Sequence, residues 1–267
     1  EFDDDLYESL KAADKIILSS HLNFDGSIQD HLFEDINFGV SDYVIGSVFD
    51  GVYKYQLIYN DSLKMLPLKV FEEINGSSIH KAGPFVKVGD WWTLNNFIMN
   101  YRLLQKDIED IEAGFNPINL GELLYLEDQD IQDFIGGKVV VIGDFFEHDT
   151  HETIFEITAG PLILLNALLT IHDQETKIGA SFFLLIVLFY FFLSYMAFTD
   201  NDIVENWINR ITTSKVTKYF AGFTSYFVIL TLLSIITFFL FNVHINVFFI
   251  AVAFYIVDRL AYWLVKR

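Results

Sequence analysis

The densest group of side chains that could do chemistry lies between residues 144 and 152. Its members are carboxylates and imidazoles, namely Asp144, Glu147, His148, Asp149, His151 and Glu152. Because imidazole and carboxylate groups ligate Zn²⁺ and other divalent cations, the two histidines could hold a metal. The same residues would also suit an exposed acidic loop in which Asp149 caps a turn. The metal stays unassigned, and we predict a ligand-binding group made of Asp144, His148, Asp149, His151 and Glu152.

Trp91 and Trp92 form a second candidate for ligand binding. Paired indole rings can act as a stacking platform for a ligand. More often, adjacent tryptophans place one ring in the core and the other on the surface. Both residues are kept as candidate binding residues.

Motifs that mark enzymes are missing from the sequence. It has no Walker motif, nucleophile elbow, zinc-protease motif, kinase loop or cyclase signature. Gly136, Gly137 and Gly143 flank an apolar run, but the dinucleotide-binding fingerprint needs its glycines after the strand and at the start of a helix. The chain has no cysteine, which excludes disulfides and thiol chemistry. The sequence therefore predicts a protein that is not an enzyme and carries no cofactor.

An α/β domain would position the candidate residues. Lys138–Ile142 (KVVVI) is an unbroken, mostly β-branched run, typical of a strand buried on both faces of a mostly parallel sheet flanked by helices. Ligands tend to bind beyond the carboxyl ends of such strands, where the acidic group lies. Helices are expected at 3–13, 67–74, 128–135 and 161–171, strands at 15–19, 85–88 and 97–101, and a hairpin within 43–59 that turns at 49–51.

Three long apolar runs fill the last third of the chain. Ile178–Phe198 has 21 uncharged residues, Tyr219–Phe241 has 23, and Val247–Val265 follows after a short turn. At about 1.5 Å rise per residue, each run is long enough as a helix to cross a hydrocarbon core of roughly 30 Å. The sequence predicts a globular domain over residues 1–176 and three transmembrane helices within residues 177–267.

Two features of the predicted membrane region could connect it to partners. Asp258 and Arg259 place a charged pair inside the third run, where such residues either couple and assemble helices or reach the membrane surface. The link over residues 199–218 repeats apolar residues on one helical face around Trp207. We predict that this link is an interfacial amphipathic helix with Trp207 as its anchor.

Charge is divided unequally along the chain. Residues 1–176 carry 10 Lys and Arg against 32 Asp and Glu, a net charge of −22, whereas residues 177–267 carry 7 against 4. Because the basic residues lie in the 199–218 link and at the C-terminus, the positive-inside rule predicts that both face the cytoplasm and that residues 1–176 are periplasmic. The acidic part would repel nucleic acid and favour cationic ligands or basic partners. Its export would require a signal or a span upstream of Glu1.

The motifs around the KVVVI run resemble the CHASE2 domain, an extracytoplasmic sensory module of bacterial membrane receptors. The matching residues are Gly137, Lys138, Val139–Gly143, Asp149, Gly160 and Asn166–Ala167, with Asp3, Leu6, Asp50–Lys54 and Asn100–Arg102 upstream. Three apolar runs after this domain are also the family's arrangement. The chain departs from the family pattern at Lys54, where an Arg is usual, and at Thr153–Ile154, where Thr-Pro is usual.

The resemblance implies a bacterial inner-membrane sensor whose periplasmic domain recognises a signal that three helices transmit. A second interpretation is a non-catalytic subunit of a cell-envelope complex that acts through protein contacts. A third is an outer metal-dependent enzyme that uses His148 and His151. The partners expected for the first two are the lipid bilayer and other membrane proteins or a second copy of the chain.

Overall fold

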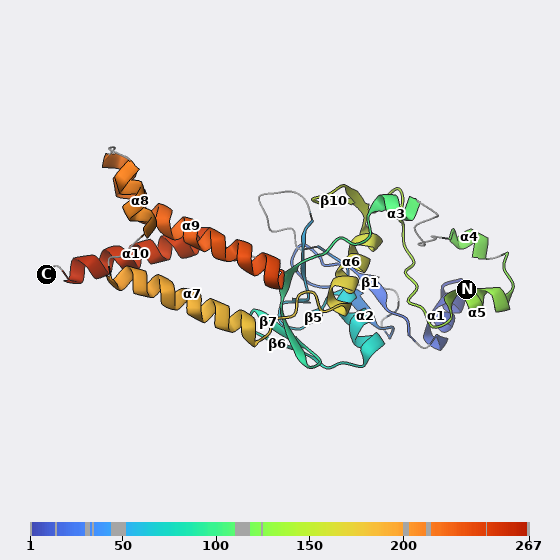
Figure 1. Ribbon diagram of the computed structural model, residues 1–267. Coiled ribbons are helices and arrows are strands. Elements are labelled where there is room, and N and C mark those ends of the chain that lie inside the picture. Colours follow the sequence, from blue (N-terminus) through green and yellow to red (C-terminus); the bar gives the residue numbers. More distant parts are fainter. Residues whose placement is uncertain are drawn as a thin grey trace. The chain divides into compact units, whose positions relative to one another are not determined.

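The computed structural model describes residues 2–13, 15–29, 33, 35–43, 52–109, 118–123, 125–199, 203–211, 215–243 and 245–265 (Figure 1). The chain divides into two compact units. The first comprises Glu1–Gly89 and Asn95–Gln174, and the second comprises Asp90–Leu94 and Glu175–Arg267. The chain therefore passes from one unit to the other at three points. The last of these lies two residues before the boundary that the sequence predicts.

The first unit is a mixed α/β unit built from short elements. Its helices are α1 (Phe2–Ala12), α2 (Leu66–Asn75), α3 (Gln105–Glu109), α4 (Leu120–Leu123), α5 (Asp128–Ile135) and α6 (Gly160–His172). Its strands are β1 (Leu18–Ser20), β2 (Phe38–Val40), β3 (Lys54–Gln56), β4 (Ile58–Tyr59), β5 (Leu63–Lys64), β6 (Ile79–Ala82), β7 (Phe85–Val88), β9 (Asn96–Ile98), β10 (Thr150–Glu152) and β11 (Ile157–Ala159). The four predicted helices are confirmed as α1, α2, α5 and α6.

The expectation of a mostly parallel sheet is wrong for the described part of the chain. β1 pairs with β2 in parallel, with Leu18 opposite Phe38. The pairs β3–β9, β4–β5, β6–β7 and β10–β11 are antiparallel. Short connections favour antiparallel neighbours because a parallel pair needs a long crossover. β4 and β5 illustrate this with Asn60 and Asp61 at positive φ (42° and 66°) in their turn. The hairpin turn predicted at 49–51 lies outside the described residues.

The predicted central strand is the second correction. Lys138–Ile142 joins none of the described strands, and its four β-branched side chains are exposed: Val139 by 52%, Val140 by 52%, Val141 by 36% and Ile142 by 76%. The run begins after α5 and Gly136-Gly137, where the helix was expected to stop. A β-branched run becomes a buried strand only if other strands and helices cover it, and the residue pattern alone does not establish that cover.

The core of the first unit forms where α2 and α6 pack together. Pro67 lies in the first turn of α2, and Gly76 ends the helix at a φ of 60°. The largest fully buried side chains of this unit include Tyr55, Leu57, Met65, Leu68, Leu162, Ile163 and Ile171. Gly39 of β2 lies against the backbone of Leu66, where an added Cβ would be 2.6 Å from the Leu66 Cα. β2 therefore approaches α2 at a distance that suits only glycine.

α6 also holds the segment Asn100–Leu103 through buried polar side chains. Asn166 Oδ1 accepts the backbone N–H groups of Arg102 and Leu103, both at 3.0 Å, and its Nδ2 donates to the Leu103 carbonyl at 2.8 Å. Thr170 Oγ1 accepts the Asn100 N–H at 3.1 Å. Both side chains are fully buried. The strand expected over 97–101 therefore ends at Ile98, as β9. The following segment runs beside α6 and is held there by hydrogen bonds from Asn166 and Thr170.

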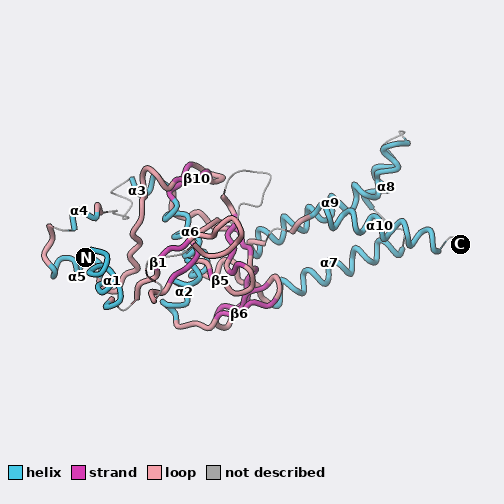
Figure 2. Tube along the Cα trace, turned by 180° about the vertical axis from the view of Figure 1, so that it is seen from behind, coloured by secondary structure: helices cyan, strands magenta, loops and turns pink. Residues whose placement is uncertain are grey.

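The described part of the second unit contains three long helices, which can be followed in Figure 2. Its described elements are β8 (Trp91–Leu94), α7 (Ala180–Thr199), α8 (Ile203–Ile211), α9 (Lys215–Phe241) and α10 (Val247–Val265). Leu193 of α7, Tyr226, Leu230 and Leu233 of α9, and Ala251 of α10 form one buried apolar cluster. Each predicted apolar run is thus confirmed as a helix, and the three helices pack on one another through this cluster.

β8 is hydrogen-bonded to the residues that lead into α7. The Ile178 N–H donates to the Trp92 carbonyl at 2.7 Å, and the Thr93 hydroxyl donates to Thr176 Oγ1 at 2.8 Å. Both threonines are buried. These contacts explain why Asp90–Leu94 belongs to the second unit.

Among the described residues, one helix is long and apolar enough to cross a membrane, judged by length and composition. Within α9, the stretch Ala221–Phe241 has 21 residues and a mean hydropathy of 2.2. The described side chains of α7 and α10 provide shorter apolar stretches, Ala180–Met196 and Val247–Val257. By this measure, α9 is consistent with membrane association.

Candidate functional site

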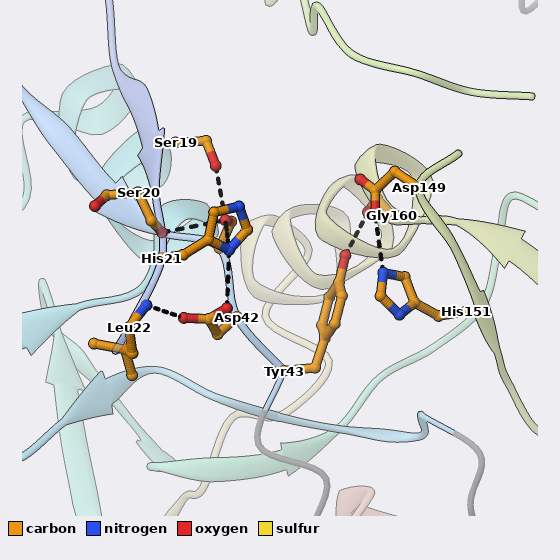
Figure 3. A network of polar contacts seen from close by, with 10 residues as sticks. Ser19, Ser20, His21, Leu22, Asp42, Tyr43, Asp149, His151 and Gly160 are labelled. Carbon is orange, nitrogen blue, oxygen red and sulfur yellow. Dashed lines mark hydrogen bonds and ion pairs between the residues drawn. The ribbon is translucent and has the colours of Figure 1, made fainter. Parts of the chain in front are cut away.

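Polar side chains gather where the two parallel strands end (Figure 3). We call this group the polar edge, and it comprises Ser19, Ser20, His21, Ser41, Asp42 and Tyr43. Because β1 and β2 are parallel, their carboxyl ends meet at one edge. The Ser19 hydroxyl donates to Ser41 Oγ at 2.7 Å, and the Ser41 hydroxyl donates to the Ser20 carbonyl at 3.2 Å. The carboxyl ends of parallel strands are a common place for ligands in α/β folds.

His21 and Asp42 form a paired imidazole and carboxylate at the polar edge. Nδ1 of His21 lies 2.9 Å from Asp42 Oδ1, and Asp42 Oδ2 accepts the backbone N–H of Leu22. Ser41 Oγ lies 3.5 Å from the same Nδ1 atom. In a hydrolytic Ser-His-Asp triad the serine and the aspartate contact opposite ring nitrogens. These three side chains are therefore not arranged as a triad.

Tyr43 connects the polar edge to the start of α6. Its hydroxyl donates to the Gly160 carbonyl at 2.8 Å, and its ring meets the His151 ring edge-on with centroids 4.7 Å apart. Burial raises the pKa of Tyr43, and the Asp149 carboxylate raises it further. Tyr43 therefore remains a neutral hydrogen-bond donor and does not serve as a base.

Tyr55 packs behind Tyr43, with the two rings edge-on and their centroids 6.2 Å apart. The residue is 1% exposed, and its hydroxyl has no hydrogen-bond partner among the described groups. Burial is the main cause of its raised pKa. A buried hydroxyl without a partner costs about 1–3 kcal/mol. The fold therefore tolerates a polar group here at the expense of stability.

Asp149 and His151 form a second carboxylate and imidazole pair. Asp149 Oδ1 lies 2.9 Å from His151 Nε2, and the Asp149 carbonyl accepts the Gly160 N–H at 2.7 Å. A Cβ on residue 160 would clash with the Asp149 carboxylate. The carboxylate can therefore reach His151 in this position only because residue 160 is glycine.

Asp144 and His148 lie in a turn just before β10. Asp144 accepts the backbone N–H groups of Phe146, Glu147 and His148 at 2.9–3.0 Å, and His148 Nδ1 lies 3.1 Å from Asp144 Oδ2. The N–H of Glu147, followed by those of Phe146 and His148, holds the pKa of Asp144 well below its usual range. Asp144 therefore caps this turn as a carboxylate.

The predicted ligand-binding group is thus divided into two His–Asp pairs. Glu152 is exposed in β10, and its carbonyl accepts the Val52 N–H at 2.8 Å. Within the described part of the chain, no three His, Asp or Glu side chains are placed to hold a metal ion. The geometry of the described residues therefore offers two imidazoles that aspartates orientate, and it does not bring a set of metal ligands together.

The tryptophan pair alternates along β8. Trp91 is buried at 4% exposure, whereas Trp92 is 37% exposed. Successive side chains of a strand point to opposite faces, so one ring fills the core and the other is open to a ligand or neighbour. The two rings do not form one stacking platform.

The candidates in the apolar helices are placed as follows. The Arg259 guanidinium carbon lies 5.1 Å from the centroid of the Tyr255 ring, one turn earlier in α10. The side chain of Asp258 lies outside the described residues. Trp207 and Ile211 in α8 are both 64% exposed. Their spacing of four residues gives α8 an exposed apolar face.

The polar edge was not predicted as a binding site from the sequence. The available signal was the order of residue types, because SSH directly follows the apolar run IIL and SDY directly follows FGV. Polar residues at the end of a strand are candidates for binding when two such strands are neighbours. The sequence pattern does not show that these two runs are parallel neighbours.

The polar edge and the adjacent Asp149–His151 pair can exchange hydrogen bonds and protons with a polar ligand. The imidazole side chains of His21 and His151 are 58% and 34% exposed, and each is orientated by an aspartate. The two aspartate carboxylates at this site favour a cationic ligand. The chain matches no protein-family model, no curated protein and no solved structure. The resemblance to CHASE2 therefore depends on the short motifs given above.

Proposed function

We propose that the chain is a bacterial inner-membrane sensory protein, in which a CHASE2-like periplasmic unit recognises a signal and three transmembrane helices transmit it. The observation that carries this proposal is the exposed apolar surface of α7, α9 and α10. Phe191 is 71% exposed, Phe239 is 80% exposed and Phe249 is 72% exposed. Soluble proteins rarely expose large apolar patches of this kind. Lipid tails are the solvent that suits them.

Helix length supports three spans. α7 has 20 residues, α9 has 27 and α10 has 19. At about 1.5 Å per residue these lengths are about 30, 40 and 28 Å, against a hydrocarbon core of roughly 30 Å. The exposed apolar face of α8 supports an interfacial position for the link between the first two spans.

The connection between β8 and α7 supports transmission of a signal. β8 is hydrogen-bonded to Thr176 and Ile178 just before α7 begins, yet residues 89 and 95 on either side of Asp90–Leu94 belong to the first unit. A displacement of β8 would therefore act directly on the start of α7. In this proposal the polar edge and the His151–Asp149 pair provide the recognition site, which takes a small polar or cationic molecule.

Single-cysteine labelling tests the membrane topology, because the natural chain contains no cysteine. Tyr125 is 91% exposed in the first unit. A Tyr125→Cys variant should react with a membrane-impermeant maleimide in intact spheroplasts. An Arg267→Cys variant should react only after the membrane is permeabilised. The reverse pattern, or recovery of the chain in the soluble fraction, would refute the proposal.

A non-catalytic subunit of a cell-envelope complex is the second candidate function. The exposed run Lys138–Ile142 favours it, because exposed apolar patches often mark protein contacts. A subunit should co-purify in mild detergent with other membrane proteins at fixed stoichiometry. A sensor should instead purify alone, and a catalytic domain encoded after Arg267 would favour this function further.

A further inference from the structure

The run Lys138–Ile142 is exposed and pairs with none of the described strands. It crosses from α5 to β10 without helix or strand (Figure 1). Among the described residues, no backbone hydrogen bond is made by the N–H or C=O groups of Val139, Val140, Val141 or Ile142. Phe134 before the run and Phe146 after it are 39% and 56% exposed. Apolar side chains and free backbone groups are thus presented together.

Such a run is suited to pair with another strand. Free N–H and C=O groups in an apolar, β-branched segment form a template for strand addition. The residue order of this run is self-complementary in the antiparallel direction, because a cation precedes the apolar residues and an anion follows them. When the run faces a copy of itself about Val141, Lys138 stands opposite Asp144 and Val140 stands opposite Ile142.

We propose that Lys138–Asp144 is a self-association edge, at which two copies of this chain pair their runs antiparallel about a two-fold axis through Val141. In a closed two-fold pair, Lys138 of each copy faces Asp144 of the other, so that opposite charges stand across from each other at both ends. A strongly basic peptide would instead place a like charge opposite Lys138. An acidic peptide would do so opposite Asp144, whose carboxylate is kept in place by three backbone N–H groups. A second copy is therefore the occupant that fits both ends.

The pairing is weak in free solution. A single pair of short strands contacts far less surface than the roughly 1,200–2,000 Å² of a stable interface. Residues 1–176 of each copy carry a net charge of −22, so two copies also repel one another. Confinement of both copies to one membrane raises their effective concentration and offsets these costs. The strength of the pairing in cells, though not its geometry, rests on the proposed membrane function.

Cysteine cross-linking tests the register. In the proposed pair the two copies of Val141 face each other, within the Cα separation of about 4.4–6.8 Å that a disulfide requires. The two copies of Val139 are offset by four residues, or about 13 Å along the strands. Val139 is the more exposed of the two side chains, at 52% against 36%, so random collision would favour Val139. The full chain with Val141→Cys should therefore form severalfold more disulfide dimer than the full chain with Val139→Cys under mild oxidation.

A mixture experiment and a charge variant complete the test. Tagged Val140→Cys and untagged Ile142→Cys chains should form a mixed disulfide, because these residues face each other across the pair. Adding Lys138→Glu to the Val141→Cys chain should lower its dimer yield severalfold, because it places two like-charge pairs at the ends, and higher salt should recover part of the loss. Equal dimer yields from Val139→Cys and Val141→Cys would overturn the inference.

Measurements on isolated membranes and on the purified chain in detergent separate this inference from the proposed function. Carbonate extraction of the same samples reports membrane insertion. A chain that is released by carbonate but still prefers Val141→Cys cross-linking would refute the membrane function and keep the self-association edge. A chain that stays in the membrane but shows no preference for Val141→Cys would refute the self-association edge and keep the membrane function.

Discussion

Replacing Asn166 with alanine should release the segment Asn100–Leu103 from α6. The carboxamide makes four hydrogen bonds: it accepts the N–H groups of Arg102 and Leu103 and donates to the carbonyls of Leu103 and Leu162. All four contacts measure 2.8–3.1 Å. Alanine keeps the helix and removes every one of these hydrogen bonds.

The magnitude follows from the groups that lose their partner. Leu103 is 6% exposed, so its N–H and C=O cannot readily turn to water. A buried polar group left unsatisfied costs about 1–3 kcal/mol. For the two groups of Leu103 we expect a total of about 3 kcal/mol. That energy is roughly a hundredfold change in the local opening equilibrium, at about 1.4 kcal/mol per factor of ten.

Hydrogen exchange with mass spectrometry on the full chain in detergent would measure this effect. Peptides that contain Arg102 and Leu103 should lose about a hundredfold of their protection in Asn166→Ala. Asn75→Ala is the matched control, because Asn75 is exposed and its side chain makes one hydrogen bond, to the Phe71 carbonyl at 3.0 Å. The reasoning fails if protection at Arg102 and Leu103 changes by less than about threefold, or if the control causes an equal loss at these two residues.

Three further predictions concern the polar edge, the packing of β2 and the Asp144 turn. Tyr43→Phe should destabilise the first unit by about 1 kcal/mol, because it removes the hydrogen bond to the Gly160 carbonyl. Tyr55→Phe should be neutral or stabilising, because the buried Tyr55 hydroxyl has no partner among the described groups. Equal losses of stability in urea unfolding would contradict this prediction. Gly39→Ala should cost about 1–3 kcal/mol of stability through overpacking, because the added Cβ would push β2 away from the Leu66 backbone of α2. An unchanged thermal unfolding midpoint would refute the close approach. Asp144→Asn should weaken the protein at pH 7. Because the folded-state pKa of Asp144 is lowered, its stabilising effect is present above the ordinary pKa of an aspartate and is lost as the pH falls through the folded value. The difference between the variant and the natural chain should therefore shrink when unfolding is measured in strong acid, and a difference independent of pH would contradict the assignment.

Local patterns in the sequence were enough to predict the longer helices, though not the short helices α3 and α4. α2 has Pro67 in its first turn and Gly76 at its end, and α5 stops at two glycines. These signals act within a few residues, so they need no knowledge of the rest of the fold. The helices α7, α9 and α10 follow from the length of the apolar runs for the same reason. The charge division between the two parts of the chain is a property of composition alone.

Contacts between distant residues had to come from the tertiary structure. The KVVVI run has the composition of a buried strand, yet burial depends on whether neighbours cover it, and it is exposed. Asn166 was recognised only as part of a motif, whereas its buried hydrogen bonds to Leu103 show what it does. The assignment of β8 to the second unit depends on its hydrogen bonds with residues more than 80 positions away, such as Thr176.

The sequence by itself determined where the longer helices lie, which part is acidic and which part is apolar, because these depend on neighbouring residues and on composition. Only the tertiary structure decided that β1 and β2 lie parallel and bring His21 together with Asp42. The same is true of Tyr43, which reaches Gly160 across 117 positions of the chain. Strand pairing is set by contacts between segments far apart in sequence, and no local pattern specifies which segments will meet.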